Sequence, residues 1–154
     1  MKMFKKTLFW SWLVVWATIP MLMGAFVALA LIIAGKKPRI HYNMLTFEIG
    51  YNWGGFSCGF VKLVSVNPSE HLSVHEWGHA AQMVILGNFS LLLVMLPSVI
   101  RYWHRKWIQK HWREKHKILP PYDSIWFEGT ASQLGYKYLL GRKYIWKRKN
   151  GSIV

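Results

Sequence analysis

The sequence has few acidic residues and almost no cysteine. Against 20 Lys and Arg it has 6 Asp and Glu, and its single cysteine, Cys58, has no partner for a disulfide within the chain. A small scaffold held together by disulfides is therefore excluded. The excess of positive charge, +14 at pH 7, predicts a partner that carries negative charge, either anionic lipid headgroups or nucleic acid.

The hydrophobic content excludes a disordered chain. Hydrophobic residues make up 53% of the 154 residues, and 10 residues are Trp. Side chains of this kind must be buried in protein or in lipid. The length suits one domain rather than two.

A long run without a charged side chain extends from Thr7 to Ala34, with Lys residues on both sides of it. As a helix it would be about 42 Å long, more than the roughly 30 Å thickness of the hydrocarbon core of a bilayer. The run therefore predicts an N-terminal transmembrane helix, with residues 1–40 as a membrane anchor. A cleaved signal peptide is the alternative, although its apolar region would be shorter. Pro20 could kink the helix or divide it into a re-entrant pair.

Short stretches rich in Phe, Tyr, Val and Ile follow the anchor and predict a β-hairpin. Its strands would be residues 45–51 and 56–66, joined by a turn at the Asn and Gly residues of 52–55. Gly59 would form a bulge in the second strand.

The next segment predicts a helix that carries a metal-binding motif. Asn67 can cap this helix, with Pro68 in its first position, and Gly87 is a usual stop residue after Leu86. Within it lies the HExxH sequence His75-Glu76-Trp77-Gly78-His79. Two His residues four positions apart lie on one face of a helix and can bind one zinc ion, with the adjacent Glu76 placed to act as general base.

Catalytic zinc needs a third protein ligand and an open fourth position. Among the acids, Glu128 is the best candidate, because it lies in an apolar Trp-Phe context where an unpaired charge would be costly. Its predicted helix carries small residues that would allow close approach to the helix of the two His residues: Gly129, Ala131, Ser132 and Gly135. The alternative is that Glu128 is a first-turn acid favoured by the helix dipole.

The sequence between these two helices is first apolar and then basic. Residues 89–100 are too few to cross a bilayer and include Pro97, so we expect a membrane-dipping or core segment. Residues 101–117 carry seven Lys or Arg and one acid, interleaved with Trp, which favours a helix on an anionic membrane surface. Stacking on nucleic-acid bases is the competing interpretation. A final helix should run from Asp123 or Ser124 to Leu140.

The HEWGH motif, followed downstream by Trp-Phe-Glu-Gly-Thr-Ala, resembles the gluzincin-type zincin metallopeptidases. In these a Glu on a second helix, often in a Glu-Gly-x-Ala context, joins the HExxH motif. Residues 67–135 are also similar to uncharacterised bacterial membrane-anchored proteins with an HEWGH motif. The resemblance implies that His75, His79 and Glu128 bind Zn²⁺, that Glu76 is the general base, and that a peptide could add as a strand beside the hairpin. The spacing from His79 to Glu128 is longer than in the short-spaced gluzincins.

Together these patterns predict an α+β fold, in which the transmembrane helix precedes a small zincin-like domain over residues 41–154, with a membrane-associated segment at 89–117. We expect a membrane-anchored zinc metallopeptidase that hydrolyses peptide or protein substrates through a zinc-bound water activated by Glu76. The alternatives are a non-catalytic membrane protein with a structural zinc site, and a basic lipid- or nucleic-acid-binding protein in which the motif is accidental. Nucleic acid is the less favoured partner.

Several further residues are candidates for supporting roles. His71, one turn before His75, is expected to be a polar neighbour of the site rather than a fourth ligand. Asp123 or Ser132 could be the partner of a zinc-bound His. The candidates for stabilising an oxyanion are Tyr122, Tyr136, His111 and His116. The positive-inside rule favours a bacterial cytoplasmic membrane with the domain on the cytoplasmic side, and labelling of Cys58 would test that orientation.

Overall fold

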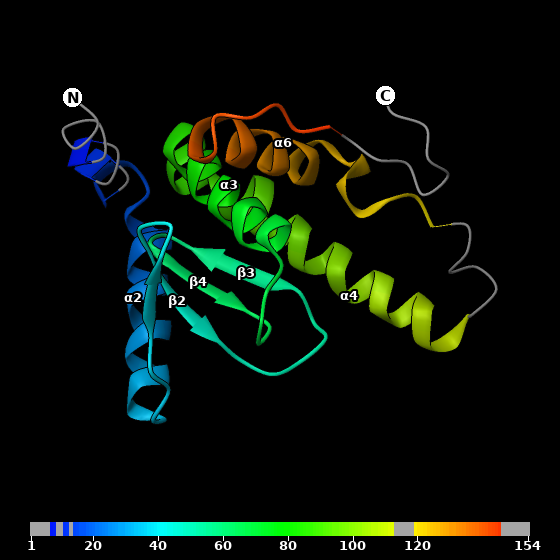
Figure 1. Cartoon of the computed structure of the whole chain (residues 1–154), viewed down its shortest axis with the longest axis horizontal. Helices are drawn as coiled ribbons and strands as arrows, with labels where there is room; N and C mark the ends of the chain where they lie inside the picture. The colour runs from blue at the N-terminus through cyan, green and yellow to red at the C-terminus, as the bar shows by residue number, and fades with distance from the viewer. Residues whose placement is uncertain (1–6, 9–10, 13, 113–118, 146–154) are drawn as a thin grey trace.

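The chain has a mixed α+β fold, as the sequence predicts. The computed structural model (Figure 1) describes residues 7–8, 11–12, 14–112 and 119–145. Within these residues the chain forms a four-stranded sheet with the order β1-β2-β4-β3. The strands are β1 (Arg39–His41), β2 (Met44–Glu48), β3 (Gly55–Cys58) and β4 (Val61–Val64).

Helices α2 (Thr18–Ile33) and α3 (Glu70–Leu86) cover opposite faces of this sheet. Ala28 of α2 packs with Phe47 and Val61 on one face. On the other face, Met44 packs against Trp77, Ala80 and Ala81 of α3. The alternation of side chains along a strand accounts for this arrangement, because neighbouring residues point to opposite faces.

The predicted hairpin between residues 45–51 and 56–66 is wrong. Strand β2 pairs in parallel with β4, and β3 pairs antiparallel with β4. Gly59 is not a bulge, because with a φ of 59° it lies in the tight turn between β3 and β4. The Asn and Gly residues at 52–55, predicted as the hairpin turn, lie in and at the end of the longer connection that leads from β2 to the far edge of the sheet.

The N-terminal segment is not one continuous helix. The chain leaves helical geometry at Ala17, where φ is −113° and ψ is 44°, and α2 begins at Thr18. Pro20 lies in the first turn of α2 and lacks the N–H that would continue a helical ladder back to Trp16. The prediction of one continuous helix over residues 7–34 is therefore wrong, and the helix is divided close to Pro20, as the alternative allowed. The membrane anchor over residues 1–40 stays a prediction.

No single helix among the described residues is both long enough and apolar enough to span a membrane. One pair of consecutive helical segments, Glu70–Phe89 and Leu91–His111, is together long and apolar enough to span a membrane, but the chain bends by 120° between them.

Helix α3 begins and ends close to the predicted positions. Its cap is Ser69 rather than Asn67, since the Ser69 hydroxyl accepts a hydrogen bond from the Leu72 N–H at 3.1 Å. Asn67 has a φ of 55° and lies before the helix. The helix ends at Leu86 with Gly87 as its C-cap, as predicted.

The remaining elements place α4 and α6 beside α3. After α3 come a 3₁₀ turn η1 (Gly87–Phe89), a π-helical turn η2 (Leu91–Met95) and helix α4 (Leu96–His111). The final helix begins later than predicted, because Asp123 and Ser124 form a 3₁₀ turn, η3 (Tyr122–Ser124). It comprises α6 (Trp126–Leu134) and a π-helical turn η4 (Gly135–Leu139). Figure 1 shows α6 along α3, while α4 extends away from both.

Cys58 cannot serve as the reporter of membrane orientation. Its side chain is buried, and its thiol donates a hydrogen bond to the Pro20 carbonyl at 3.1 Å. Burial raises the pKa of the thiol to about 11. Because the thiolate is the reactive form, this cysteine will not react readily with a maleimide.

Lys62 is a charged residue in the core beneath α3. Its side chain is fully buried, with Nζ 3.5 Å from the Ser73 carbonyl oxygen and 5.5 Å from the centre of the Tyr42 ring. Burial lowers the pKa of Lys62 from 10.5 to about 8, against the opposing effect of the nearby Glu76 carboxylate. The folded protein therefore releases this proton at a lower pH than the unfolded chain.

The buried lysine predicts a pH-dependent stability. Between pH 8 and 10.5 the unfolded state binds more protons at Lys62 than the folded state, so the free energy of unfolding should rise with pH. Relative to Lys62→Met, the wild type should gain up to about 3 kcal/mol over this range. Urea unfolding at several pH values measures the difference, and Lys36→Met, at an exposed position, controls for loss of a positive charge. A constant difference between the wild type and Lys62→Met would contradict the prediction.

Candidate metal centre

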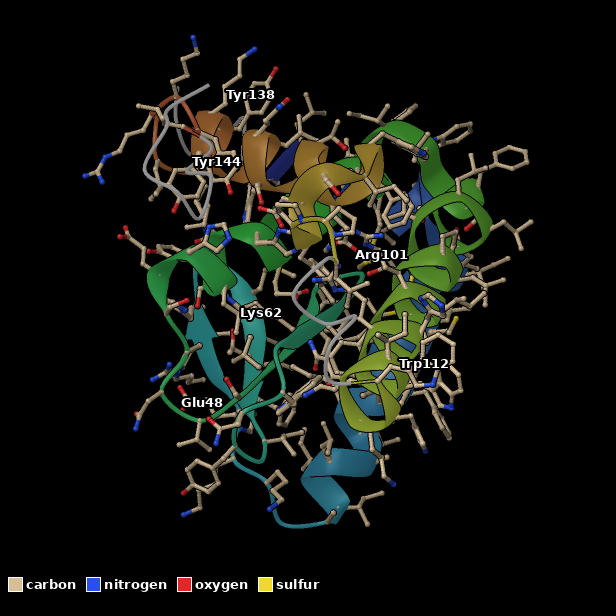
Figure 2. All side chains as sticks on the ribbon, turned by 90° about the vertical axis from the view of Figure 1, so that its right-hand side faces the viewer. Glu48, Lys62, Arg101, Trp112, Tyr138 and Tyr144 are labelled. Carbon is tan, nitrogen blue, oxygen red and sulfur yellow. The ribbon has the colours of Figure 1, made fainter. Side chains whose placement is uncertain are left out.

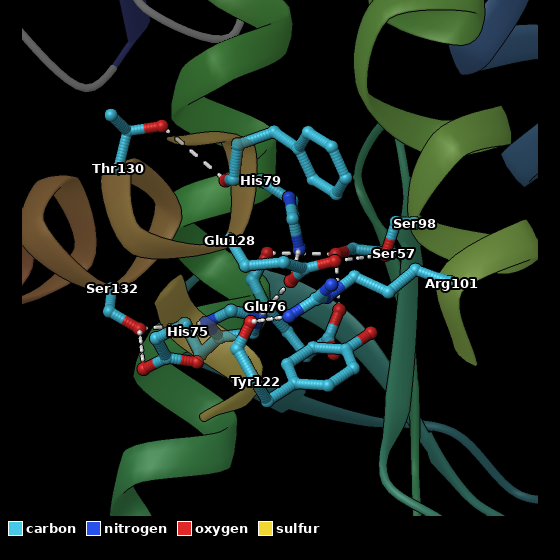
Figure 3. Close-up of polar contacts among 12 residues, drawn as sticks. Ser57, His75, Glu76, His79, Ser98, Arg101, Tyr122, Glu128, Thr130 and Ser132 are labelled. Carbon is cyan, nitrogen blue, oxygen red and sulfur yellow. Dashed lines mark hydrogen bonds and ion pairs between the residues drawn. The ribbon is translucent and has the colours of Figure 1, made fainter. Parts of the chain in front are cut away.

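The structure brings the three predicted metal ligands together. His75 and His79 come from α3, and Glu128 comes from the first turn of α6 (Figure 3). Glu128 Oε2 lies 3.0 Å from His75 Nε2 and 3.4 Å from His79 Nε2. All three side chains are buried, and one ligand atom from each lies within 4.8 Å of the others. This group could hold a metal ion.

Close packing of α3 against α6 accounts for this convergence. A methyl group on Gly78 would overlap the Ala131 carbonyl, and a methyl group on Gly135 would overlap the Val74 carbonyl. Only glycine permits two backbones to approach so closely at these positions. Of the small residues predicted to allow this approach, Ala131 and Gly135 lie at the contact, whereas Gly129 packs against the Asp123 carbonyl.

A chain of hydrogen bonds orients His75. Its Nδ1 lies 2.8 Å from the Ser132 hydroxyl oxygen, and that hydroxyl donates to Asp123 Oδ2 at 3.0 Å. Because the Ser132 proton is directed to the carboxylate, the serine oxygen is left to accept the Nδ1 proton of His75. Nε2, the nitrogen that faces Glu128 at 3.0 Å, is then the one that can bind a metal ion once it carries no proton. Both predicted partners therefore support His75, Ser132 directly and Asp123 through it.

A second set of hydrogen bonds orients His79. Its Nδ1 lies 2.8 Å from Gln82 Oε1. Gln82 Nε2 donates to the Phe127 carbonyl and to the Thr130 hydroxyl oxygen, both at 2.6 Å, which fixes the orientation of the amide. The Gln82 oxygen therefore accepts the Nδ1 proton, so that Nε2 is the nitrogen of His79 that can bind a metal ion once it carries no proton.

Glu128 is held as a carboxylate. Burial alone would raise the pKa of Glu128, but the hydrogen bonds with His75 and His79 and the donor hydroxyl of Ser98, 2.5 Å from Oε1, lower it well below its usual range. Two imidazole Nε2 atoms and one carboxylate form a donor set that Zn²⁺ accepts readily at a catalytic site. The residues present thus fit the predicted ion.

Glu76 lies beside this group and is held by strand β3. The Ser57 hydroxyl lies 2.6 Å from Glu76 Oε2 and 2.9 Å from the Glu76 carbonyl oxygen. At Gly55, a methyl group would collide with the Glu76 side chain. The carboxylate is therefore packed directly against the strand at the edge of the sheet, in the orientation seen in Figure 3.

The site opens into a cleft of about 400 Å³. Strand β3 forms one wall, and residues of α4 form another; Ser57, Ser98, Tyr102 and Arg105 line it together with the three ligands and Glu76. His71 also lines the cleft but is not one of the converging ligands, and its Nε2 is 3.8 Å from Asp123 Oδ2. This position agrees with the prediction of a polar neighbour.

Among the predicted oxyanion stabilisers that the structure describes, Tyr122 is the one that lines the cleft. Burial and the neighbouring Glu128 carboxylate raise the pKa of Tyr122, so its hydroxyl stays protonated as a donor. Tyr136 instead lies 3.4 Å from His71 Nδ1, and His111 bonds the Trp107 carbonyl near the end of α4. His116 lies outside the described residues.

Three residues of the site were not predicted from the sequence: Gln82, Ser98 and Ser57. Gln82 carries a local signal, because a residue three positions after His79 on a helix lies on the same side. Ser98 and Ser57 have no such local signal in the sequence. Ser98 contacts Glu128 from 30 residues away, and Ser57 contacts Glu76 from 19 residues away, each from a different element.

The orientation of His79 predicts an effect of Gln82 on metal affinity. Gln82→Leu removes the acceptor for the Nδ1 proton and should weaken zinc binding by about 10–100-fold. Gln133→Leu, at an exposed position of α6, makes the same chemical change away from the site and should leave the affinity unchanged. Competition with a chromophoric chelator gives both dissociation constants. Equal affinities for the two variants would show that Gln82 does not orient a ligand.

Comparison of the chain with protein-family models, with curated proteins and with solved structures finds no significant match. What connects this chain to the gluzincin-type zincins is therefore the HExxH motif and the distant Glu128, which the fold brings together. Membership of that family stays a proposal.

Proposed function

We propose that this protein is a zinc-dependent metallopeptidase. The observation that carries the proposal is the placement of Glu76: a carboxylate that is not one of the three converging ligands, adjacent to them and open to the cleft. A catalytic zinc site needs this combination of three protein ligands, a free coordination position and a nearby base.

Glu76 is suited to the role of general base. Its carboxylate lines the cleft, where it can take a proton from a water molecule and pass it to the departing amine. The Ser57 hydroxyl and the close backbone of Gly55 restrict its position. A base that is held in one orientation needs little rearrangement during the reaction.

The bound zinc ion would supply Lewis-acid polarisation of the scissile carbonyl and of the attacking water. The Tyr122 hydroxyl, protonated and facing the same cleft, would donate a hydrogen bond to the oxygen that becomes negative as the water adds. Ser132 and Gln82 would keep both imidazoles in the tautomer that binds metal through Nε2.

The substrate class follows from the edge strand. Strand β3 is at the edge of the sheet formed by the described residues and lines the cleft at Gly55, Phe56 and Ser57. An extended peptide can bond to the free backbone groups of such a strand, with its scissile bond beside Glu76. This favours a peptide or an unfolded protein segment as substrate.

The alternative is a structural zinc site in a non-catalytic membrane protein. Structural zinc is usually held by four protein ligands, whereas three residues converge here among those the structure describes. His71 lies beside Asp123 and does not join the group, so no fourth ligand comes from the part of the chain that the structure describes. Location at the bacterial cytoplasmic membrane, with the domain on the cytoplasmic side, is part of our proposal and is based on the distribution of charge.

The general-base role predicts a separation of binding from catalysis. Glu76→Gln should retain about one zinc ion per chain but lower kcat for peptide hydrolysis by about 10²–10⁴-fold. Glu70→Gln, which makes the same change in the exposed first turn of α3, should keep both zinc and activity. Removal of zinc by a chelator should abolish hydrolysis, and added zinc should restore it.

Peptide-library assays with matched protein preparations would measure these effects. Hydrolysis by Glu76→Gln at the wild-type rate would contradict the mechanism. If the zinc-loaded wild type cleaves no member of the library, the structural alternative is favoured.

A further inference from the structure

Helix α2 exposes an apolar face that the other described residues do not cover. The sequence of α2, TIPMLMGAFVALALII, contains no charged residue. Its inner side, with Pro20, Gly24 and Ala28, is buried against the sheet. The outer side is exposed, with Leu22 at 65% and Phe26 at 72%. A helix that is apolar on all sides normally has every side covered, by protein or by lipid.

This apolar surface continues onto the end of α3 and the turns after it. Trp12 Nε1 donates to the Val84 carbonyl at 3.1 Å, and the Ile19 N–H donates to Asn88 Oδ1 at 2.9 Å. These bonds hold the segment around the start of α2 against η1. Apart from Asn88, the exposed residues of the segment 85–93 are also apolar: Ile85, Phe89, Leu92 and Leu93.

The outer side of α4 extends the same surface. Leu96, Ile100, Trp103 and Trp107 recur at helical spacing and are exposed, whereas Ser98, Tyr102 and Arg105 on the inner side line the cleft. In the view of Figure 2, α4 is drawn in front of α2, and both lie to the right of most of the sheet. We refer to the exposed apolar residues of α2, of the segment 85–93 and of α4 as the apolar belt.

The charge around the belt identifies the kind of partner that it fits. The sequence has no acidic residue before Glu48, and none between Glu76 and Glu114, so the belt-bearing segments carry only positive charge. Exposed cations border it at both ends, with Lys36 and Lys37 after α2 and Lys110 on α4. A second copy of this chain would bring like charges together, whereas an anionic bilayer offers both an apolar interior and complementary headgroups.

We propose that the apolar belt inserts into one leaflet of an anionic lipid bilayer, so that several helices bind the membrane from one side. Trp103 and Trp107 then lie at the level of the headgroups, where Trp is favoured. Because α4 carries the belt on one side and the wall of the cleft on the other, the candidate metal centre lies at the membrane surface. The proposal does not rest on peptidase activity, because lipid binding requires none of the three metal ligands.

Vesicle flotation of the full-length protein tests the proposal. Vesicles of phosphatidylcholine with about a quarter phosphatidylglycerol should bind the wild type more tightly than phosphatidylcholine alone, and added salt should reduce the difference. Phe26→Glu and Trp103→Glu should each lower the partition coefficient about tenfold or more. Phe26→Glu places a charge in the apolar region, and Trp103→Glu replaces an aromatic ring at the level of the headgroups by a carboxylate that anionic lipid repels.

Tyr138→Glu is the matched control. Tyr138 is exposed to 63%, close to the 66% of Trp103, but it lies on η4, away from the belt (Figure 2). Since this variant changes the net charge by the same amount, it should lower the partition coefficient by no more than about twofold. His79→Ala should bind vesicles like the wild type, which separates lipid binding from the metal centre.

Three results would overturn the proposal. One is an equal loss of vesicle binding in all three acidic variants, which would indicate a general effect of charge. Another is a wild type whose Trp fluorescence is not quenched by lipids brominated on their acyl chains, a measurement that needs no variant. The third is a wild-type dimer that Trp103→Glu converts to a monomer, without vesicle binding, which would instead assign the belt to a second copy of the chain.

Discussion

The close contact between α3 and α6 is the constraint on which the candidate metal centre depends. Gly78 lies against the Ala131 carbonyl and Gly135 against the Val74 carbonyl, and this spacing lets Glu128 reach both imidazoles. Larger side chains there would move the carboxylate away from His75 and His79. The hydrogen bonds of Ser132 and Gln82 also cross between these helices, so the same packing sets the orientation of the ligands. The packing of the protein core therefore also sets the geometry of the metal centre.

The metal ligands could be predicted from the sequence because their signals are local. The spacing of His75 and His79 needs only helical geometry, and Glu128 could be recognised by its apolar and small neighbours. Ser57 and Ser98 could not be predicted, because their contacts with Glu76 and Glu128 depend on how strand β3 and helix α4 are packed. The scarcity of acids fits this organisation, since Glu76, Asp123 and Glu128 all line one cleft.

The fold was predictable to a lesser extent. The ends of α3 follow from local capping preferences, but the pairing of β2 with β4 depends on contacts between distant parts of the chain. The Asn and Gly residues at 52–55 are typical of a hairpin turn, so the hairpin was predicted there. The tight turn lies instead at Gly59, which was predicted to be a bulge. The apolar run at 7–34 likewise could not reveal that its second half packs on a sheet. Burial in protein and burial in lipid select the same residue types.

The central claim is that the two helices form a three-ligand zinc site. Native mass spectrometry of the protein, purified without chelators and with Glu70→Ala as a control in the exposed first turn of α3, tests it most directly. We expect one zinc ion per wild-type and control chain, and none bound by His79→Ala or Glu128→Ala. A folded wild type without zinc would contradict the account, and so would a Glu128→Ala variant that keeps its zinc.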